Sequence, residues 1–423
     1  MLRSILGGGI FLATLVSVMV RPYRVSEALS AAGGAILMLA FGFVGLPEAL
    51  KLLAGEWNTL GFFLGLMVIS AVAEDAGVFD VLGYQAARWG GGSAARLYLA
   101  VFAVGTLITV FLSNDATALI LTPVVYALVT RLRLPVLPFV FACTFVADAA
   151  SMILPVSNPV NIIILHSFGA RLGEFLRYLL VPAAAAVVLN AAVFLFRFRR
   201  ELAQGYRLST LRPPRPRDPR LLGAAGIILL LIAGAYVAAS ATGFPLSLVA
   251  LGGALLLVSA SAARGRRDLR SLSSRISWSL FLFIGGMFIV VKGVENLGFS
   301  AQAARLLLGA SGGKPFATVL LVTTGTALGS NLINNVPMAL VMVSTLHGLP
   351  DTAAARASLP FAAMFGADLG PNLTTVGSLA TMLWLLILRR RGLEVSTREY
   401  VKLGMTFVPA LLLLGSVLIW ARI

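Results

Sequence analysis

Long apolar stretches recur along the whole chain, and they constrain its fold more than any other feature. A helix needs about 20 apolar residues to cross the hydrocarbon core of a bilayer. Stretches that reach or approach this length lie near residues 3–20, 26–46, 56–74, 135–168, 175–197, 221–240, 245–262, 276–294, 356–388 and 400–420. Because the membrane core holds no water for unpaired backbone groups, such stretches must form helices. The sequence therefore predicts an all-α polytopic membrane protein with about ten transmembrane helices.

The composition and the placement of charge exclude a soluble domain. A mean hydropathy of +0.94 with only 12% charged residues lies far above the range of soluble globular chains. The net charge of +16 does not predict a nucleic-acid partner, because the basic residues lie in connections between apolar stretches. The single cysteine, Cys143, excludes a disulfide framework and any multi-thiolate metal site. We expect no metal site and no cofactor. The stretch 5–20 lacks a small-residue cleavage site, which favours a retained helix over a signal peptide.

Two further apolar stretches, 93–131 and 315–347, are interrupted in the middle by polar residues. Each is long enough to enter the membrane and return to the same side, which predicts a re-entrant helical hairpin. Non-helical backbone at the tip of such a hairpin is stable only where protein or a water-filled cavity surrounds it. We therefore expect both polar tips to lie inside the protein.

The two halves of the chain repeat each other. An offset of 220 residues relates Asp148 to Asp368 and Asp115 to Asn335. Upstream the offset is 221, and it relates Trp57 to Trp278, Glu74 to Glu295 and Gly77 to Gly298. Each half holds five spanning helices and one hairpin, so an odd number of crossings separates them and their orientations must be opposite. The chain is predicted to comprise an N-terminal repeat (1–197), a linker (198–220) and an inverted C-terminal repeat (221–423).

Arginines gather in the connections that this topology places on one side. The linker 198–220 and the connection 264–275 are both strongly basic. Positive charge retains loops in the cytoplasm, so both are predicted to be cytoplasmic. The same orientation places these residues inside: Arg21, Arg24, Arg88, Arg131, Arg133, Arg389, Arg390 and Arg391. The first hairpin then opens to the cytoplasm, and the second, almost free of basic residues between Lys314 and Arg356, opens to the outside.

Three aspartates, Asp115, Asp148 and Asp368, lie inside apolar stretches rather than in connections. A charged side chain at the centre of a membrane helix costs about 2.5–3.5 kcal/mol on insertion scales. Structure alone rarely tolerates such a cost, which favours a functional role. We predict that these carboxyls bind and release protons. The alternative is that they cap broken helices by accepting backbone N–H groups, and such a cap can also contact a substrate.

Four polar clusters interrupt the apolar stretches. They are Ser113-Asn114-Asp115, Ser157-Asn158 with Asn161, Asn331 with Asn334-Asn335, and Asp368 followed by LGPNLTTVGS. Nearby residues that favour helix breaks are Pro155, Pro159, Pro337, Pro371, Gly329, Gly370 and Gly377. Broken helices leave free backbone groups and half-helix dipoles around such clusters. Because no Lys or Arg lies within them, they favour a small neutral solute with several hydroxyls over a multiply charged anion.

Four stretches of the sequence carry a family resemblance. They read SNDATALILTPVV, FVADAASMILPVSNPVNIIIL, SNLINNVPMALV and GADLGPNLTTVGSLATMLWL. They look like the membrane motifs of the bacterial arsenite/antimonite efflux permeases, the arsenical pump membrane proteins of the ion transporter superfamily, and the likeness covers nearly the whole chain. The resemblance implies that a central site is formed by Asn114, Asp115, Asp148, Ser157, Asn158, Asn334, Asn335, Asp368, Thr374 and Ser378. Neighbouring polar residues complete the predicted substrate-binding set: Ser113, Thr117, Asn161, Asn372 and Gly377.

The remaining distinctive side chains have simpler interpretations. One thiol supplies a single ligand to arsenic, so Cys143 is interpreted as a small packing residue. His166 and His347 lie near predicted membrane boundaries and are interpreted as surface residues. The glutamates of the repeat lie at helix ends, where we expect ion pairs: Glu74 with Arg88, and Glu295 with Lys292.

The sequence and the resemblance together predict a secondary active transporter, not an enzyme, in a bacterial cytoplasmic (inner) membrane. It would export arsenite and antimonite, as neutral trihydroxides, in exchange for protons by alternating access. The chain has no GxxxxGK[ST] motif and is not expected to hydrolyse ATP itself, although a peripheral arsenite-stimulated ATPase stays open as a partner. Three alternatives also stay open: a silicic acid exporter of the same family, a Na⁺/H⁺ or carboxylate transporter of the same superfamily, and a passive channel.

Overall fold

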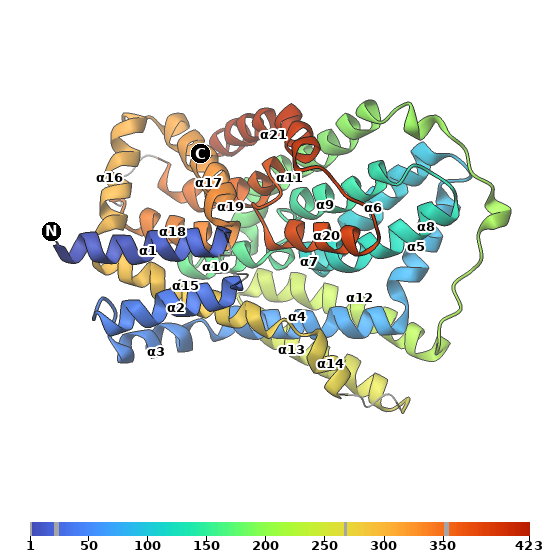
Figure 1. Ribbon diagram of the computed structural model, residues 1–423, viewed down its shortest axis with the longest axis horizontal. Coiled ribbons are helices and arrows are strands. Elements are labelled where there is room, and N and C mark those ends of the chain that lie inside the picture. The colour runs from blue at the N-terminus through green and yellow to red at the C-terminus, as the bar shows by residue number, and fades with distance from the viewer. Residues whose placement is uncertain (1, 21–24, 266–268, 351–354) are drawn as a thin grey trace.

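The computed structural model describes residues 2–20, 25–265, 269–350 and 355–423, and within these ranges the chain is almost wholly helical (Figure 1). Seven of the described helices are long and apolar enough to cross a membrane: α4 (Trp57–Ala76), α6 (Ala94–Phe111), α11 (Leu172–Arg197), α12 (Pro219–Thr242), α15 (Trp278–Asn296), α17 (Pro315–Ile333) and α21 (Thr397–Trp420). Further apolar helices include α1 (Leu2–Val20), α2 (Glu27–Ala40) and α13 (Leu246–Ala262). The predicted all-α polytopic membrane fold is confirmed.

Four short helices lie where the sequence analysis expected only connections. They are α3 (Leu46–Gly55), α5 (Val78–Trp89), α14 (Leu269–Arg275) and α16 (Phe299–Ser311). Gly77 and Gly298 precede α5 and α16 with φ of 83° and 80°, a left-handed conformation that glycine adopts without steric cost. Two glycines that the repeat relates therefore form the same sharp turn after a membrane helix.

Both predicted hairpins are broken at their tips. In the first, α6 ends at Phe111 and the chain resumes with α7 (Asn114–Ala116), the π-helical turn η2 (Thr117–Leu121) and α8 (Thr122–Arg131). In the second, Asn334 separates α17 from α18 (Asn335–His347) and has φ of 72° and ψ of 155°, a conformation that favours glycine. Gly329 does not contribute to this break, contrary to expectation. It lies inside α17, where its missing side chain leaves room for Met338 of α18.

Two predicted membrane stretches are likewise split. Stretch 135–168 forms α9 (Leu137–Ala150), the 3₁₀ turn η3 (Pro155–Ser157) and α10 (Pro159–Phe168). Stretch 356–388 forms the 3₁₀ turn η6 (Arg356–Ser358), α19 (Leu359–Leu369), the 3₁₀ turn η7 (Gly370–Leu373) and α20 (Leu379–Arg390). Pro155, Pro159 and Pro371 occupy the first or second position of the turn or helix in which they lie. A proline is tolerated there because the N–H group it lacks has no partner within the helix.

Four apolar helices pack in reciprocal pairs across the two halves of the chain. α4 lies against α13, and α15 lies against α2 (Figure 1). Glycines allow the backbones to approach: a Cβ added to Gly65 would lie 2.5 Å from the carbonyl carbon of Ala250, and one added to Gly286 would lie 2.8 Å from that of Ala31. Such small-residue contacts are a usual basis of helix association in membranes. We call α2, α4, α13 and α15 the scaffold.

The hairpins and broken helices form a second layer beside the scaffold (Figure 1). Within it, α6 packs on α9 and α17 packs on α19, while α11 and α21 cover the far side. Aromatic rings fill the space between α9, α11 and α21. The ring of Phe145 lies 4.8 Å from that of Phe194 and 5.7 Å from that of Phe407, measured between centroids. We call α6–α10 and α17–α20 the hairpin layer.

The linker lies at one end of the molecule and contains two short 3₁₀ turns, η4 (Glu201–Ala203) and η5 (Leu208–Thr210) (Figure 1). The Tyr206 N–H donates to the Gly92 carbonyl at 2.8 Å, and the Tyr206 hydroxyl donates to the Ala87 carbonyl. These bonds hold the linker against the turn between α5 and α6. Of the arginines that predicted its orientation, Arg21, Arg24, Arg266 and Arg267 lie outside the described residues. The assignment of this end to the cytoplasm therefore remains a prediction.

The close contact between α4 and α13 can be tested with an added methyl group. Gly65→Ala should destabilise the protein by about 1–3 kcal/mol, because its Cβ would overlap backbone atoms of Ala250, which have no room to move. The control is Gly252→Ala on α13, where a Cβ would have no neighbour within 4 Å and where alanine favours the helix. Thermal unfolding in detergent measures both changes. Equal midpoints for the two variants would contradict the packing argument.

Candidate functional site

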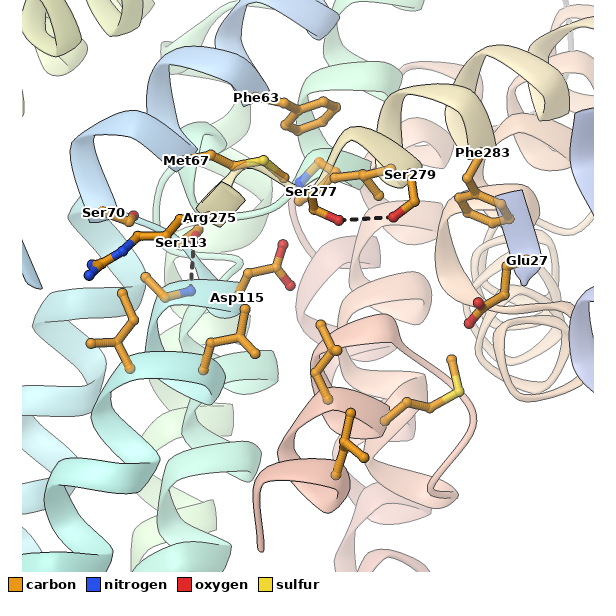
Figure 2. Close-up of a pocket in the computed structure, with 18 of the residues that line it drawn as sticks. Glu27, Phe63, Met67, Ser70, Ser113, Asp115, Arg275, Ser277, Ser279 and Phe283 are labelled. Carbon is orange, nitrogen blue, oxygen red and sulfur yellow. Dashed lines mark hydrogen bonds between the residues drawn. The ribbon is translucent and has the colours of Figure 1, made fainter. Parts of the chain in front are cut away.

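A cavity of about 680 Å³ lies between the scaffold and the hairpin layer (Figure 2). The side chains on its scaffold wall include Phe63, Met67, Ser70, Ser277, Ser279 and Phe283. The opposite wall is formed by Ser113 and Asp115 at the tip of the first hairpin, Pro159 at the first helix break, and Thr375 and Val376 at the second. Figure 2 shows the Asp115 carboxylate pointing into the space between these walls. The cavity thus ends at non-helical backbone from both halves of the chain.

Charged groups at the rim of this cavity correct one expected ion pair. Glu74, which lines the cavity near the end of α4, pairs with Arg275 at 3.3 Å instead of with Arg88. Arg275 belongs to α14, a helix that the apolar pattern did not predict, so its position could not be foreseen. The other expected pair is present, with Lys292 Nζ 2.9 Å from Glu295 Oε1.

Side chains at the tip of the first hairpin cap the helix that resumes there. The Ser113 hydroxyl accepts the Ala116 N–H at 3.0 Å, and Asn114 Oδ1 accepts the Asp115 N–H at 2.9 Å. Thr117 points elsewhere, because its hydroxyl lies 2.7 Å from the Thr109 hydroxyl inside the hairpin. Ser113 and Asp115 therefore line the cavity, whereas Thr117 stabilises the hairpin behind it.

The first helix break is capped in the same way and is tied to the hairpin tip. Asn158 Oδ1 accepts the Val160 N–H at 3.1 Å, which caps α10. The Ser157 hydroxyl donates to the Val110 carbonyl of α6 at 3.1 Å. Tip and break therefore form one hydrogen-bonded unit, in which backbone groups freed by one interruption are partnered by side chains from the other.

Asp368 joins the two halves of the chain. It is fully buried in the last turn of α19, and its Oδ1 accepts the Asn158 amide at 2.7 Å. Its Oδ2 accepts the Ser151 hydroxyl at 2.9 Å and the Asn161 amide at 3.0 Å. Hydrogen bonds to a carboxylate are stronger than those between neutral groups. Three donors from the first break thus converge on one acceptor from the second.

The second hairpin tip is tied to the second helix break. The Asn331 amide donates to the Gly370 carbonyl at 2.7 Å, and Asn331 Oδ1 accepts the Thr374 hydroxyl at 2.7 Å. The Asn335 N–H donates to the Gly377 carbonyl at 3.0 Å. Together with the bonds of Asp368, these contacts link all four interruptions in a continuous chain.

Four other predicted site residues lie behind the cavity wall. Asn334 and Ser378 each accept a backbone N–H from the helix that follows, at 3.4 and 3.1 Å. Asn372 and Asp148 are buried, and neither lines the cavity. Of the predicted substrate-binding residues, Ser113 and Asp115 line the cavity, and the others do not.

The sequence analysis did not single out the scaffold wall. Ser70, Ser277 and Ser279 present hydroxyl groups to the cavity, and the Ser277 and Ser279 oxygens lie 3.2 Å apart. The signal for these residues was weak, because Ser70 sits within an ordinary apolar helix and the other two flank Trp278 at the beginning of one. They are distinguished only by their position across the cavity from the tip of the first hairpin.

The thiol and the two histidines agree with their simpler interpretations. Cys143 is fully buried in α9 and does not line the cavity. His166 and His347 are exposed near the ends of α10 and α18, and His166 Nδ1 lies 3.8 Å from Glu56 Oε2. Among the described residues, no three His, Cys, Asp or Glu side chains are grouped in a way that would hold a metal ion.

Comparison with known proteins supports a transport role for this architecture. The profile of the citrate transporter family matches residues 14–366. The arsenical pump membrane protein of Escherichia coli K12 is 30% identical over 405 residues, which cover 95% of this chain and 94% of that protein. The protein of the same name from Yersinia enterocolitica is 29% identical over 413 residues, with the same coverage of each chain. An uncharacterised transporter of Mycobacterium tuberculosis is 28% identical over 379 residues, 87% of this chain and 86% of that one.

A solved structure shares the fold at lower identity. The crystal structure of the Alcanivorax borkumensis YdaH transporter, described as having an unusual topology, matches with a TM-score of 0.60 and 15% identity, and the match covers 99% of this chain and 97% of that chain. A polytopic helical fold with a cavity that ends at broken helices defines a membrane transporter. The chain belongs to the citrate transporter family and, within it, to the arsenical pump membrane proteins.

The link between Asn331 and Thr374 gives a prediction about stability. Asn331→Leu should cost about 1–3 kcal/mol, because it removes the amide donor to the Gly370 carbonyl and leaves the Thr374 O–H without its acceptor. Thr374→Val should cost less, since it removes only one of these bonds. Because the two residues share that bond, the double variant should lose less than the sum of the single changes. Thermal midpoints of the three variants measure this, and full additivity would show that the bond contributes nothing.

Proposed function

We propose that this protein exports arsenite and antimonite from the cytoplasm, as neutral trihydroxides, in exchange for protons. The observation that carries the proposal is the identity of 30% with an arsenical pump membrane protein along nearly the full length of both chains. Transport would proceed by alternating access, with the hairpin layer moving against the scaffold. The protein would reside in the bacterial inner membrane, and a peripheral arsenite-stimulated ATPase is a partner that the same relatives make worth testing.

The chemistry of the cavity supports a neutral, hydroxyl-bearing solute. Its walls offer the Ser113, Ser277 and Ser279 hydroxyls and the Asp115 carboxylate. Hydroxyls can donate to the oxygens of a trihydroxide, and a carboxylate can accept from its O–H groups. The arginines that line the cavity, Arg275 and Arg389, come from the ends of α14 and α20. Arg275 is already paired with acidic side chains of α4.

The same chemistry weighs against citrate, the substrate in the name of the matching family. A tricarboxylate needs concentrated positive charge to offset its own charge, and bidentate arginines are the usual means. Here a carboxylate, Asp115, points into the cavity, and the lining arginine Arg275 is already paired with Glu74 and Asp75. Silicic acid is also a small neutral polyhydroxide and satisfies the same donors and acceptors. It is therefore the rival that transport assays must separate.

The position of the cavity supports an exporter in a conformation open to the cytoplasm. It is lined by Arg275 and Arg389, which the arginine distribution assigns to the cytoplasmic end. Under this orientation the Asp115 tip is reached from the cytoplasm. A neutral solute gains nothing from the membrane potential, so uphill export requires a driving ion. Asp115, Asp148 and Asp368 are the candidate carriers of the driving proton.

Transport by everted membrane vesicles tests the proposed substrate and its coupling. Vesicles from cells that express the chain should accumulate arsenite when a respiratory substrate is present, release it when a protonophore is added, and work without Na⁺. The same vesicles should accumulate antimonite but not citrate, and a parallel measurement with silicic acid decides between the two neutral substrates. Accumulation that survives the protonophore or requires Na⁺ would contradict proton antiport.

The proposed inverted topology can be tested with single cysteines in a Cys143→Ser background. Gln204 in the linker and Lys314 at the beginning of α17 are both exposed. A membrane-impermeant thiol reagent should label Lys314→Cys in intact cells and Gln204→Cys only in everted vesicles, because positive charge holds the linker inside. Labelling of both positions from the same side would overturn the inverted repeat.

A further inference from the structure

The three aspartates of the hairpin layer lie in three different surroundings. Asp115 faces the cavity. Asp368 accepts three hydrogen bonds from side chains of the first helix break. Asp148, in α9, is only 1% exposed, and neither of its carboxyl oxygens has a hydrogen-bond partner among the described residues. The sequence repeat relates Asp148 to Asp368, but Asp368 accepts three side-chain hydrogen bonds and Asp148 accepts none.

Polar groups from three other elements gather at the turn of α9 that carries Asp148. Asn190 of α11 and Asn372 of η7 both donate their amides to the Phe145 carbonyl, at 3.2 and 3.5 Å. The ring of Tyr400, from α21, lies 5.0 Å from that of Phe145, which precedes Asp148 by about one helical turn in α9. We call Asp148, Asn190, Asn372 and Tyr400 the α9 polar group.

The α9 polar group has acceptor atoms that lack donors. The side-chain oxygens of Asn190 and Asn372 are buried and, in the part of the chain that the structure describes, have no hydrogen-bond partner. A buried polar atom without a partner costs about 1–3 kcal/mol, so a cluster of them is expensive to retain unless it binds something. Oxygen atoms grouped around a carboxyl bind a proton or a small cation.

The contrast with Asp368 decides which carboxyl is free to exchange a proton. A carboxyl that takes up a proton gains a donor O–H and must give up part of the hydrogen bonds that it accepts. The three donors to Asp368 therefore make it a fixed acceptor, and taking up a proton would disturb the bonds that join the two breaks. Asp148 has no such bonds to lose. The Tyr400 hydroxyl, which can both donate and accept, is the group of this set that can relay a proton.

We propose that Asp148 carries the coupling proton within the α9 polar group and that Asp368 is a positioning residue that joins the two broken helices. None of the four residues of the α9 polar group lines the cavity. The proton and the solute would therefore bind at separate places in the same moving layer. This inference rests on the proposed function, because it specifies where proton exchange takes place during arsenite export.

Reconstituted full-length protein separates the two roles. Proteoliposomes that hold a pH-sensitive dye report proton movement when arsenite is added, and radiolabelled arsenite reports accumulation and downhill exchange. Asp148→Asn keeps the shape of the side chain but cannot exchange a proton, so it should lose both proton movement and uphill accumulation while retaining exchange. Asp368→Asn should lose exchange as well as accumulation, and its thermal midpoint should fall, because an amide cannot accept all three donors.

One further variant tests the proposed relay, and another serves as a control. Tyr400→Phe removes the relay hydroxyl and should slow proton movement without abolishing it. Thr242→Val removes an exposed hydroxyl at the end of α12, which donates to the Ala238 carbonyl of its own helix and belongs to neither site, and it should leave the proton-to-arsenite ratio unchanged. Proton movement that persists in Asp148→Asn would overturn the proposal. So would an Asp368→Asn protein that exchanges arsenite normally but moves no protons, since the two roles would then be reversed.

Chemical modification of the unaltered protein provides a test that does not depend on folded variants. A hydrophobic carbodiimide adds to protonated carboxyls in apolar surroundings, and peptide mass mapping locates the adduct. Asp148 should be modified, and arsenite-driven proton movement should decline in step with that modification. A map in which Asp148 is unmodified would contradict the assignment. A Na⁺ gradient that drives accumulation would also overturn it, because the α9 polar group would then bind a cation.

Failure of this inference is distinguishable from failure of the proposed function. If the unaltered protein moves no arsenite under either a proton or a Na⁺ gradient, the proposed function is wrong, and this inference fails with it. If the unaltered protein accumulates arsenite in exchange for protons and Asp148→Asn does so equally, export stands and only the assignment of the proton to Asp148 fails.

Discussion

A helix that breaks inside a bilayer leaves backbone groups that water cannot partner, and four such breaks must be satisfied within this protein. Each is capped by its own short polar side chain: Ser113, Asn158, Asn334 and Ser378 all accept a backbone N–H from the helix that follows. Asp368 then draws together the first break and the second through three donors. The cavity exists where it does because these breaks can be satisfied only beside one another.

Convergence of the capped ends also sets the electrostatics of the site. The helix N-termini that begin after the breaks carry partial positive charge, and their free N–H groups favour electron-rich oxygens. Asp115 lies in the first turn of α7, and Asp368 accepts the amide of Asn158, the N-cap of α10, so both carboxylates offset that charge. A site balanced in this way, in which the lining arginine Arg275 is itself paired with Glu74 and Asp75, supports the proposal of a neutral solute whose oxygens both donate and accept hydrogen bonds.

Much of this arrangement could be predicted from the sequence, because the breaks are local. Proline and clusters of Asn and Ser inside an apolar run mark an interruption wherever the chain folds, and Pro155 and Asn334 lie where this logic placed them. The prediction of a break at Gly329 was wrong, because small residues in membrane helices also allow neighbouring helices to pack closely. Partnerships between distant segments were not predictable. Apolar patterning could not reveal that Asn158 meets Asp368, or that α14 brings Arg275 to Glu74.

The relation between scaffold and hairpin layer differs at the two ends of α4, and this difference bears on mechanism. At the beginning of the helix, Glu56 lies 3.8 Å from His166 of α10, so the two layers are in contact. Toward the other end, the side chains from Phe63 to Glu74 face the cavity instead. Layers that touch at one end and separate at the other have the geometry of a carrier open to one side. Under the proposed alternating access, the hydrogen bonds that link the four breaks would let the hairpin layer tilt about the closed end as one body and expose the Asp115 tip to the opposite side.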